Sequence, residues 1–347
     1  MAFLTNQNFL QLWSTATTIE FLRGLTFARR LNGAYDGDAM RAEKVTIQNP
    51  NYNIVTRNSE RKAEYGPASE PEAGTIEFRM NQRIDNAQDL WVEDEIENVI
   101  RDYRNRQEQA AMHALRQAHE ENIVSYILGL DTGGDFGDPL KNNGAGSIRS
   151  LEFSAASTGF SADTGKPGGT AAQKTAAIEW IPDFFTDCRV LLERSDIPVK
   201  GGGTTIGGSS GQWWAAMPPE LWAYGMAKFI TEKGGDADYV TQALRDLAVF
   251  GTMSRLMNLG TQFVGHYRGF DLFTTNSLAK PADASGHWEI IAGSDQAIAG
   301  PLRPLRNYIT EPQNNTAEKY TFRHFGTFGR QLVNSKLMIR GEFAALD

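Results

Sequence analysis

Two Asp-Thr-Gly triplets, at 131–133 and 163–165, are the residues in this sequence that most resemble a catalytic motif. In aspartic proteases two such aspartates share one proton, because like charges at short range cannot both ionise. That chemistry needs two equivalent lobes, each of which sets its triplet between apolar strands. Here both triplets lie in one polar, glycine-rich stretch that is too short to supply two lobes. We interpret them as turns, and an acid protease that uses Asp131 and Asp163 stays the least favoured hypothesis.

The other residues that could support catalysis or metal binding are scattered. The five histidines follow no metal-binding spacing, and there is no His-Glu-x-x-His, Gly-x-Ser-x-Gly or Gly-x-x-x-x-Gly-Lys-Ser/Thr motif. Asp131, Asp135 and Asp138 lack the dense spacing of a calcium loop. The single cysteine, Cys188, falls on the apolar face of a predicted helix and is interpreted as a buried structural thiol. The sequence therefore predicts no catalytic residue, no metal site and no cofactor.

The composition indicates a folded, acidic protein with room for about two domains. The chain has 347 residues, 41% of them apolar, and a net charge of −8 at pH 7. A protein that grips nucleic acid by its phosphates needs a basic face, so this charge balance argues against such binding. One cysteine excludes a disulfide framework. The N-terminal residues lack a signal-peptide pattern, and no apolar run is long enough for a membrane helix.

The longest regular pattern is helical and is predicted over residues 88–130. Apolar and small residues recur there at steps of three and four, which is the spacing of one helix face. The middle of this stripe is rich in alanine, as at Ala110, Ala114 and Ala118, so an element packed on it is expected to come close. The opposite face is charged. A helix far longer than the globular average indicates either an ordinary amphipathic core helix or a rod that supports a multi-part subunit.

Residues 43–80 are predicted to form a β-hairpin with a long tip. Val45 and Ile47 alternate with polar residues on the first strand, as do Ile76, Phe78 and Met80 on the second. The tip, residues 57–72, is charged and contains two prolines, and a connection of this length is either functional or a floppy surface loop. A two-stranded ribbon is marginal alone, so a neighbouring molecule is expected to support it. The tip residues expected to contact another subunit are Arg57, Glu60, Arg61, Lys62, Glu64 and Tyr65.

The rest of the chain is predicted to mix short strands with helices, which gives an α+β pattern without an internal repeat. An apolar N-terminal helix is predicted over 9–31, and a second helix over 176–194. The other predicted elements are an irregular region at 131–175 with a strand at 147–153, a strand at 212–217, helices at 220–232 and 237–259, two strands around a turn at Gly269, a strand at 287–292, a proline-punctuated crossing segment at 294–312, and strands over 320–343 broken at Gly326 and Gly329.

The order and spacing of these parts resemble the major capsid proteins of tailed bacteriophages, the Hong Kong 97-type fold family, a fold that encapsulin nanocompartments share. The resemblance covers nearly the whole chain, although no single motif is specific. The matching stretches are the N-terminal arm at 21–31, the extended loop with its tip at 57–73, the start of the peripheral domain at 82–89, the spine helix at 101–130, the axial-domain strands at 213–219 and 265–278, and the return to the peripheral domain at 320–343.

This resemblance implies a Hong Kong 97-like α+β fold with five segments. They are an N-terminal arm at 1–42, an extended hairpin loop at 43–81, a peripheral domain with a spine helix at 82–130, an axial domain at 131–317, and a return to the peripheral domain at 318–347. The implied function is a non-enzymatic virion protein whose hexamers and pentamers form an icosahedral shell. An encapsulin-type compartment is the main alternative.

The resemblance also implies the partners. Copies of the same chain are the first, and the shell would enclose double-stranded phage DNA without binding it specifically. Because Met1 directly precedes the arm, with no long segment before it, a separate scaffolding protein is expected rather than a fused one. A portal protein and decoration proteins are further expected partners. No membrane contact is expected, and assembly would take place in the host cytoplasm.

Overall fold

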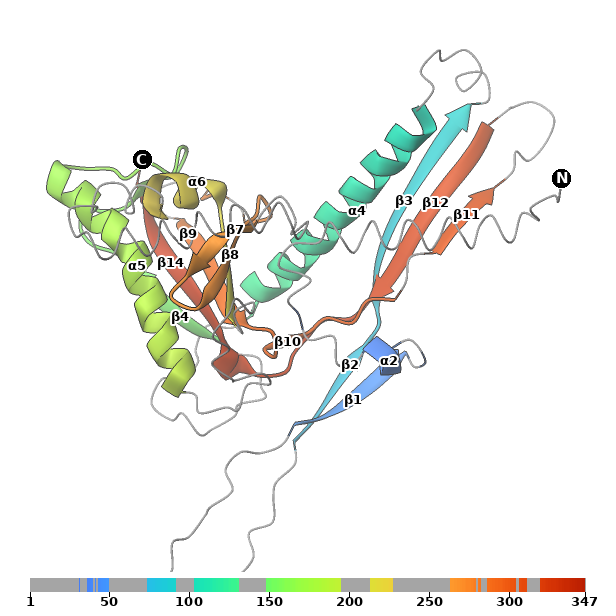
Figure 1. The fold of residues 1–347 in the computed structure, drawn as a ribbon, viewed down its shortest axis with the longest axis horizontal. Coiled ribbons are helices and arrows are strands. Elements are labelled where there is room, and N and C mark those ends of the chain that lie inside the picture. The colour runs from blue at the N-terminus through green and yellow to red at the C-terminus, as the bar shows by residue number, and fades with distance from the viewer. Residues whose placement is uncertain are drawn as a thin grey trace, which may run out of the picture.

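The computed structural model describes residues 31, 36–39, 41, 43–49, 74–91, 103–130, 148–194, 213–226, 263–278, 280–281, 286–303, 306–310 and 319–346. Figure 1 shows a lobe built on a large sheet, a long slab of helix and strands that extends from it, and a two-stranded ribbon that projects from their junction. The helix predicted over 237–259, the hairpin tip, and the N-terminal helix except Leu31 lie outside the described residues. Within the described ranges, no helix is both long enough and apolar enough to cross a membrane.

A seven-stranded mixed sheet forms the core of the lobe. Its strands are β4 (Arg149–Phe153), β5 (Phe160–Ser161), β6 (Trp213–Met217), β7 (Phe263–Tyr267), β8 (Phe270–Thr274), β9 (His287–Ser294) and β14 (Met338–Leu346). They lie in the order β4-β14-β9-β6-β8-β7, and β5 also pairs with β14. The residues of β6 from Trp214 to Met217 are all fully buried, so this strand is covered on both faces. Burial on both faces explains why the sequence shows an apolar run there instead of alternation.

The sheet confirms the strands predicted at 147–153, 212–217 and 287–292 and the turn at Gly269. β7 and β8 are joined through Arg268 and Gly269, whose φ angles are 49° and 93°. Two consecutive residues with positive φ match the type I′ turn, whose backbone twist suits a tight hairpin. The glycine at the second position accepts this conformation without steric cost.

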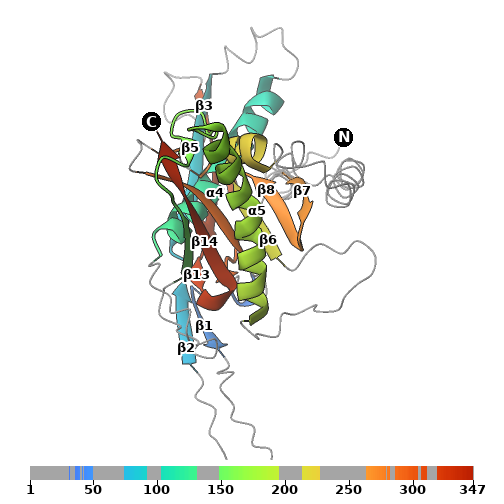
Figure 2. The same ribbon diagram turned by 90° about the vertical axis from the view of Figure 1, so that its left-hand side faces the viewer.

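Helix α5 (Ala171–Arg194) covers one face of this sheet, as Figure 2 shows. It begins five residues before the predicted start because Thr170 and Gln173 form a capping box. The Gln173 side chain accepts from the backbone N–H of Thr170 at 2.7 Å, and the Thr170 hydroxyl accepts from that of Gln173 at 3.4 Å. The predicted inner face is confirmed, since Ile181, Phe185 and its neighbour Phe184 are fully buried.

After β6 the chain continues into α6 (Pro219–Leu221) and a π-helical turn, Trp222–Met226. These elements confirm the start of the helix predicted at 220–232, and the residues beyond Met226 lie outside the described part. Pro218 is extended and Pro219 opens the helix, where a missing N–H costs nothing.

The slab consists of helix α4 (Tyr103–Leu128) beside a three-stranded sheet in the order β11-β12-β3. β3 (Gln82–Trp91) and β12 (Lys319–Phe328) pair antiparallel along their whole length, and β11 (Arg306–Thr310) pairs with the other edge of β12. The helix predicted from Gln88 is therefore wrong at its start, because residues 88–91 complete β3. The break predicted at Gly326 is also wrong, since β12 runs through it; the break at Gly329 is confirmed.

The buried stripe of α4 agrees with the predicted one only in part, since Ala111, Leu115, Ile123 and Ile127 of the predicted stripe are buried. Ala110, Ala114 and Ala118 are exposed, so the expected close approach at these alanines is wrong. The stripe that faces the sheet instead includes two polar side chains, His119 and Glu120, which are only 2% and 5% exposed. The apolar members of the stripe are Ala111, Met112, Leu115, Ile123, Val124 and Ile127. A prediction that counts only apolar and small residues as buried therefore places the buried face of α4 slightly rotated about the helix axis from its observed position.

The predicted hairpin is confirmed as β1 (Lys44–Asn49) paired antiparallel with β2 (Gly74–Arg79), preceded by the short helix α2 (Asp36–Ala39). At the junction of the three parts, β10 (Ile298–Ala299) pairs with β13 (Gln331–Leu332), and the 3-10 helix Ser335–Leu337 leads into β14. The segment predicted at 318–347 thus splits, because β12 lies in the slab while β14 lies in the larger sheet. The α+β class is confirmed.

Candidate inter-subunit elements

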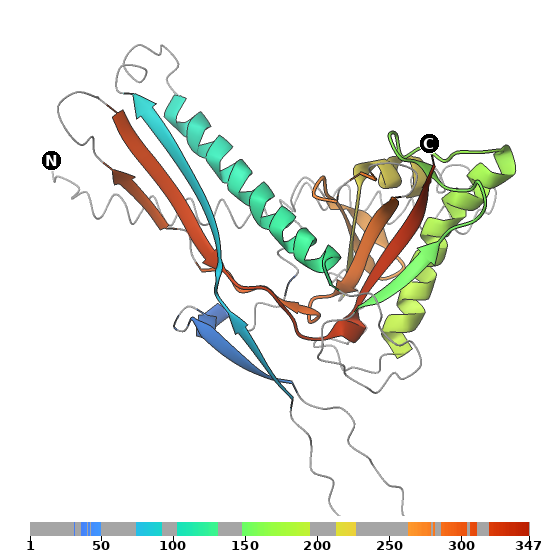
Figure 3. The ribbon, with the colours of Figure 1, turned by 180° about the vertical axis from the view of Figure 1, so that it is seen from behind.

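The projecting ribbon is the element that the sequence singled out for contact with another molecule. Its six proposed contact residues, Arg57, Glu60, Arg61, Lys62, Glu64 and Tyr65, lie outside the described residues, so their role stays a prediction. The strands that carry them are described, and Figure 3 shows β1 and β2 directed away from both the lobe and the slab. Lys44 and Glu77 form an ion pair across the two strands, but both side chains are about half exposed, so it adds little stability.

The base of the ribbon is held by a small core of its own. Val45 and Met80 from the ribbon pack with Ala299 of β10 and with Val333, which follows β13. The backbone N–H of Met80 donates to the carbonyl of Glu43 at 2.9 Å and closes the base. The direction in which the ribbon leaves the body is therefore set by the β10–β13 corner, which lies far away in the sequence.

The same corner receives the end of the N-terminal segment. A Cβ built on Gly300 would lie 2.4 Å from Cδ1 of Leu31, so Leu31 packs directly on this glycine. Leu31 is buried and belongs to the main apolar core. A residue with a side chain at 300 would displace it. The glycine thus permits an anchor point for the chain that precedes Leu31.

The slab is two layers thick, and each layer has an exposed outer face. On the helix side, Gln109, His113 and Gln117 are exposed; on the strand side, Arg83 and Asp85 are exposed. The Arg83 guanidinium lies 3.5 Å from the Asp85 carboxylate and 5.0 Å from the centre of the Phe325 ring. The slab thus has a single buried layer between two exposed faces.

Inside the slab, two histidines are buried between helix and sheet. His119 of α4 packs edge-on against Phe328 of β12, with ring centres 4.5 Å apart. Burial lowers the pKa of His119 to about 4, and burial also lowers the pKa of His324 to about 4. Both imidazoles are therefore neutral at pH 7. Their environment favours packing inside the slab over proton transfer with solvent.

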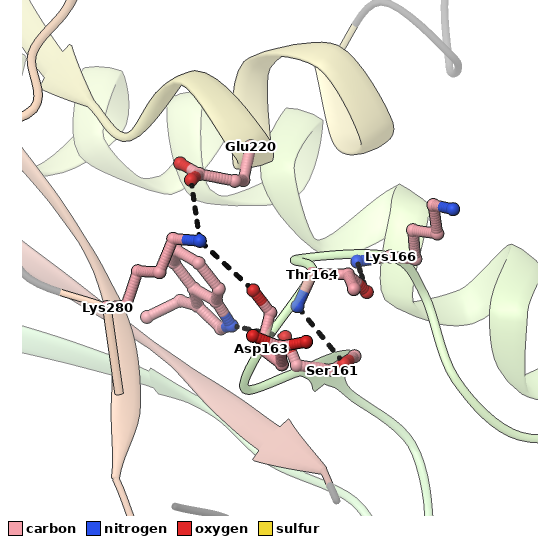
Figure 4. A network of polar contacts seen from close by, with 7 residues as sticks. Ser161, Asp163, Thr164, Lys166, Glu220 and Lys280 are labelled. Atoms are coloured by element: carbon pink, nitrogen blue, oxygen red, sulfur yellow. Dashed lines mark hydrogen bonds and ion pairs between the residues drawn. The ribbon is translucent and has the colours of Figure 1, made fainter. Parts of the chain in front are cut away.

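Asp163 lies in a turn, as its sequence predicted. The backbone N–H of Gly165 donates to the carbonyl of Ser161 at 2.8 Å, and Gly165 has a φ of 66°. Lys280 donates to the Asp163 carbonyl at 3.1 Å and lies 3.4 Å from the Glu220 carboxylate (Figure 4). The Asp163 side chain is exposed, which is the opposite of the enclosed dyad that a shared proton requires.

The other candidate groups give no chemical site in the part of the chain that the structure describes. Asp131, Asp135 and Asp138 lie outside it. Cys188 is fully buried, and desolvation, with a smaller effect of Asp187, raises the pKa of its thiol well above the usual value. A thiol held in this way is a poor nucleophile, so the structural interpretation is confirmed. Within the described ranges, no three His, Cys, Asp or Glu residues are grouped as metal ligands.

No protein-family model and no curated protein sequence matches this chain. Solved structures do match along most of its length. It is similar to the capsid of Ralstonia phage GP4, with a TM-score of 0.60 and 12% identity over 94% of this chain and 92% of that chain. It is similar to a structure from Mycobacterium phage Che8, with a TM-score of 0.55 and 14% identity over 91% and 90%. The capsid of Cyanophage P-SCSP1u gives a TM-score of 0.51 and 12% identity over 88% and 84%.

Because the sequence identities are low, the structural similarity shows a shared fold and no more. The similarity extends over both the lobe and the slab. The chain has the Hong Kong 97-type α+β fold, as its sequence predicted.

Proposed function

We propose that this chain is the major capsid protein of a tailed bacteriophage, which self-assembles into the hexamers and pentamers of an icosahedral shell. The observation that carries the proposal is the similarity to the capsid of Ralstonia phage GP4 over nearly all of both chains. Shared architecture along a whole subunit, rather than within one domain, favours a shared structural role. That role is mechanical, and we assign no catalytic step to the chain.

The geometry of the described part supports this role. The slab has one buried layer and two exposed faces, so tiling many copies side by side would produce a thin continuous wall. The ribbon is rooted in a core of only four buried side chains, Val45, Met80, Ala299 and Val333, and extends beyond its own subunit body. A ribbon of this kind gains most of its stability from a surface that it lies on. A neighbouring copy supplies that surface in a closed ring of heterologous contacts.

We further propose the partners and the location. The shell would enclose double-stranded DNA without specific binding, because a net charge of −8 does not favour a tight phosphate grip. A scaffolding protein, a portal and decoration proteins would be the other partners, and the virion the final location. We also propose how the chain divides. The arm precedes residue 43, the extended hairpin loop begins there, the slab corresponds to the peripheral domain, and the lobe corresponds to the axial domain.

The proposal predicts that the chain forms closed shells. The test is to express it in a bacterial host, isolate fast-sedimenting material and image it by negative-stain electron microscopy. Closed, uniform particles are the expected result, and particles from infected cells should contain nuclease-protected DNA. A compact monomer at high concentration would refute the proposal. Particles that hold a cargo enzyme and no DNA would favour an encapsulin-type compartment instead.

The proposed role of the ribbon tip needs its own test. One variant lacks residues 58–72, and a matched variant keeps the length but replaces Arg57, Glu60, Arg61, Lys62 and Glu64 with serine. The deletion shortens the ribbon, so that it no longer extends to a neighbouring subunit, and should abolish closed shells. The serine variant keeps the length of the ribbon but loses the charges that align neighbouring subunits, so it should assemble into less regular shells. Circular dichroism and thermal unfolding of the free subunit check that the body is intact. Normal shells from the deletion variant would refute the role of the tip.

A further inference from the structure

The carbonyl end of α4 is fastened to the C-terminal part of the chain by two arginines. α4 has no basic residue in its own last turn, although the carbonyl end of a helix carries partial negative charge. Arg340, in β14, supplies a cation at the end of the helix, and Arg330, just before β13, binds the helix earlier, at Asn122. Arg330 lies between β12 of the slab and β13 at the junction, whereas Arg340 reaches the helix from β14 of the lobe.

Arg330 grips one side of the helix. Its Nη1 donates to both the backbone carbonyl and the side-chain Oδ1 of Asn122, and its guanidinium lies 5.0 Å from the centre of the Tyr126 ring. The Tyr126 hydroxyl in turn accepts from the backbone N–H of Leu332 at 2.9 Å. Two successive turns of α4 are thus tied to the segment around β13.

Arg340 holds the last residue of the helix and belongs to β14, which lies between β4 and β9 in the sheet of the lobe. Its Nη1 donates to the carbonyl of Leu128 at 3.2 Å, its Nη2 donates to Glu289 of β9, and its Nε lies 3.3 Å from Glu342. Ser150 of β4 donates to the same Glu342 carboxylate at 2.9 Å. The three charged side chains are each 20% exposed or less. One guanidinium therefore joins the helix end to three neighbouring strands of the sheet.

The arrangement depends on the shape of arginine. Glu289 and Glu342 lie directly opposite each other in the β9–β14 register, so two carboxylates face one cation. Nη1 and Nη2 of Arg340 donate to two different partners, and Nε lies at ion-pair distance from Glu342 without a hydrogen bond, whereas a lysine has one nitrogen for all of them. The Leu128 contact ties the end of α4 to the large sheet, and the Asn122 contact ties the helix to the corner formed by β10 and β13.

We infer that Arg330 and Arg340 are positioning residues that set the angle between the slab and the lobe, and through it the curvature and diameter of the assembled shell. The inference rests on the proposed function. In a shell of repeated subunits, a small change of this angle is multiplied around every ring, so it changes which closed surface forms. Loss of the contacts should therefore alter particle size rather than merely lower stability.

The test compares Arg330→Met, Arg340→Lys and the control Arg189→Met in the expression system that yields wild-type particles. Arg189 pairs with Glu193 at 2.9 Å on α5, where both side chains are about half exposed, so its loss removes an ion pair away from the junction. Arg330→Met leaves no buried carboxylate without its cation, so this variant should fold. Arg340→Lys keeps the charge but not the three-way geometry. Electron microscopy measures particle diameter, and circular dichroism with thermal unfolding follows the free subunits.

Both junction variants should give a second population of particles with another diameter, or open sheets, while the control matches the wild type. Particles of wild-type diameter and yield from Arg330→Met would overturn the inference, even if the subunit melts at a lower temperature. Failure of the wild-type chain to form shells would count against the proposed function instead, so the two failures are distinguishable.

Discussion

Gly341→Ala should destabilise the subunit, because Gly341 is where α5 comes very close to strand β14. A Cβ added at Gly341 would lie 2.6 Å from Cε2 and 2.8 Å from Cδ2 of Phe184. Non-bonded carbons do not approach this closely, so the ring or the strand must shift. The strand is hydrogen-bonded to β4 on one side and β9 on the other, which leaves the ring to move.

The Phe184 ring has little room. It is fully buried and packs edge-on against Phe185, Phe343 and Phe153, with ring centres 5.4, 5.8 and 6.2 Å away. Adding a methyl group to a tightly packed core costs about 1–3 kcal/mol. Because both sides of this contact are constrained, we expect a loss of about 3 kcal/mol in the free energy of unfolding.

Urea unfolding of the free subunit, followed by tryptophan fluorescence, measures this loss. Gly37→Ala is the matched control, since nothing lies within 4 Å of a Cβ at that position, and it should change the free energy by less than about 1 kcal/mol. The double variant Gly341→Ala/Phe184→Leu should be less destabilised than the sum of its single changes, because the smaller side chain relieves the clash. An unchanged urea midpoint for Gly341→Ala, or strict additivity in the double variant, would refute the reasoning.

Three further predictions concern the slab, the ribbon and the N-terminal anchor. Because the pKa of His119 and of His324 is lowered to about 4, stability should be lost as pH falls from about 6.5 through 4, by up to about 3 kcal/mol per histidine. His119→Phe should show a weaker dependence in urea unfolding at pH 7.5 and 4.5, and an unchanged dependence would contradict this. Met80→Ala should cost about 2–4 kcal/mol locally, so that hydrogen exchange accelerates in β1 and β2 but not in β9; uniform acceleration would contradict a separate base core. Gly300→Ala should displace Leu31 and speed tryptic cleavage before it, with little change in the urea midpoint; wild-type resistance to trypsin would argue against the anchor.

Local patterns predicted the elements whose burial follows one simple period. The ribbon alternates apolar and polar residues, and its strands pair as expected from Lys44 opposite Arg79 to Asn49 opposite Gly74. The inner face of α5 also follows its helical spacing. A closer reading of Thr170 and Gln173 as a capping box would have placed the start of α5 correctly.

Where the sequence predicted the wrong secondary structure, the observed structure is set by pairing with residues that lie far away in the chain. Residues 88–91 carry helical spacing, yet they pair with residues 319–322 of β12, and no local pattern contains that information. The same holds for the junction. Arg330 and Arg340 bind backbone carbonyls of Asn122 and Leu128, and every residue type has a carbonyl, so the acceptors leave no signature in the sequence.

The misplaced stripe on α4 follows from the slab itself. A helix within a globular core buries most of its circumference and shows a broad apolar face, whereas in the described part of the chain most of α4 is covered on the side that faces the slab's sheet. Its buried side includes His119 and Glu120, and its exposed side includes three alanines, so the contrast between the two faces is weak. Such a slab buries few apolar side chains per residue within one subunit. The lobe, whose strand β6 is covered on both faces, has a core of its own, whereas under the proposed function the slab and ribbon gain further burial from neighbouring copies. Under the proposed function, their stability is therefore linked by mass action to the concentration of assembled subunits.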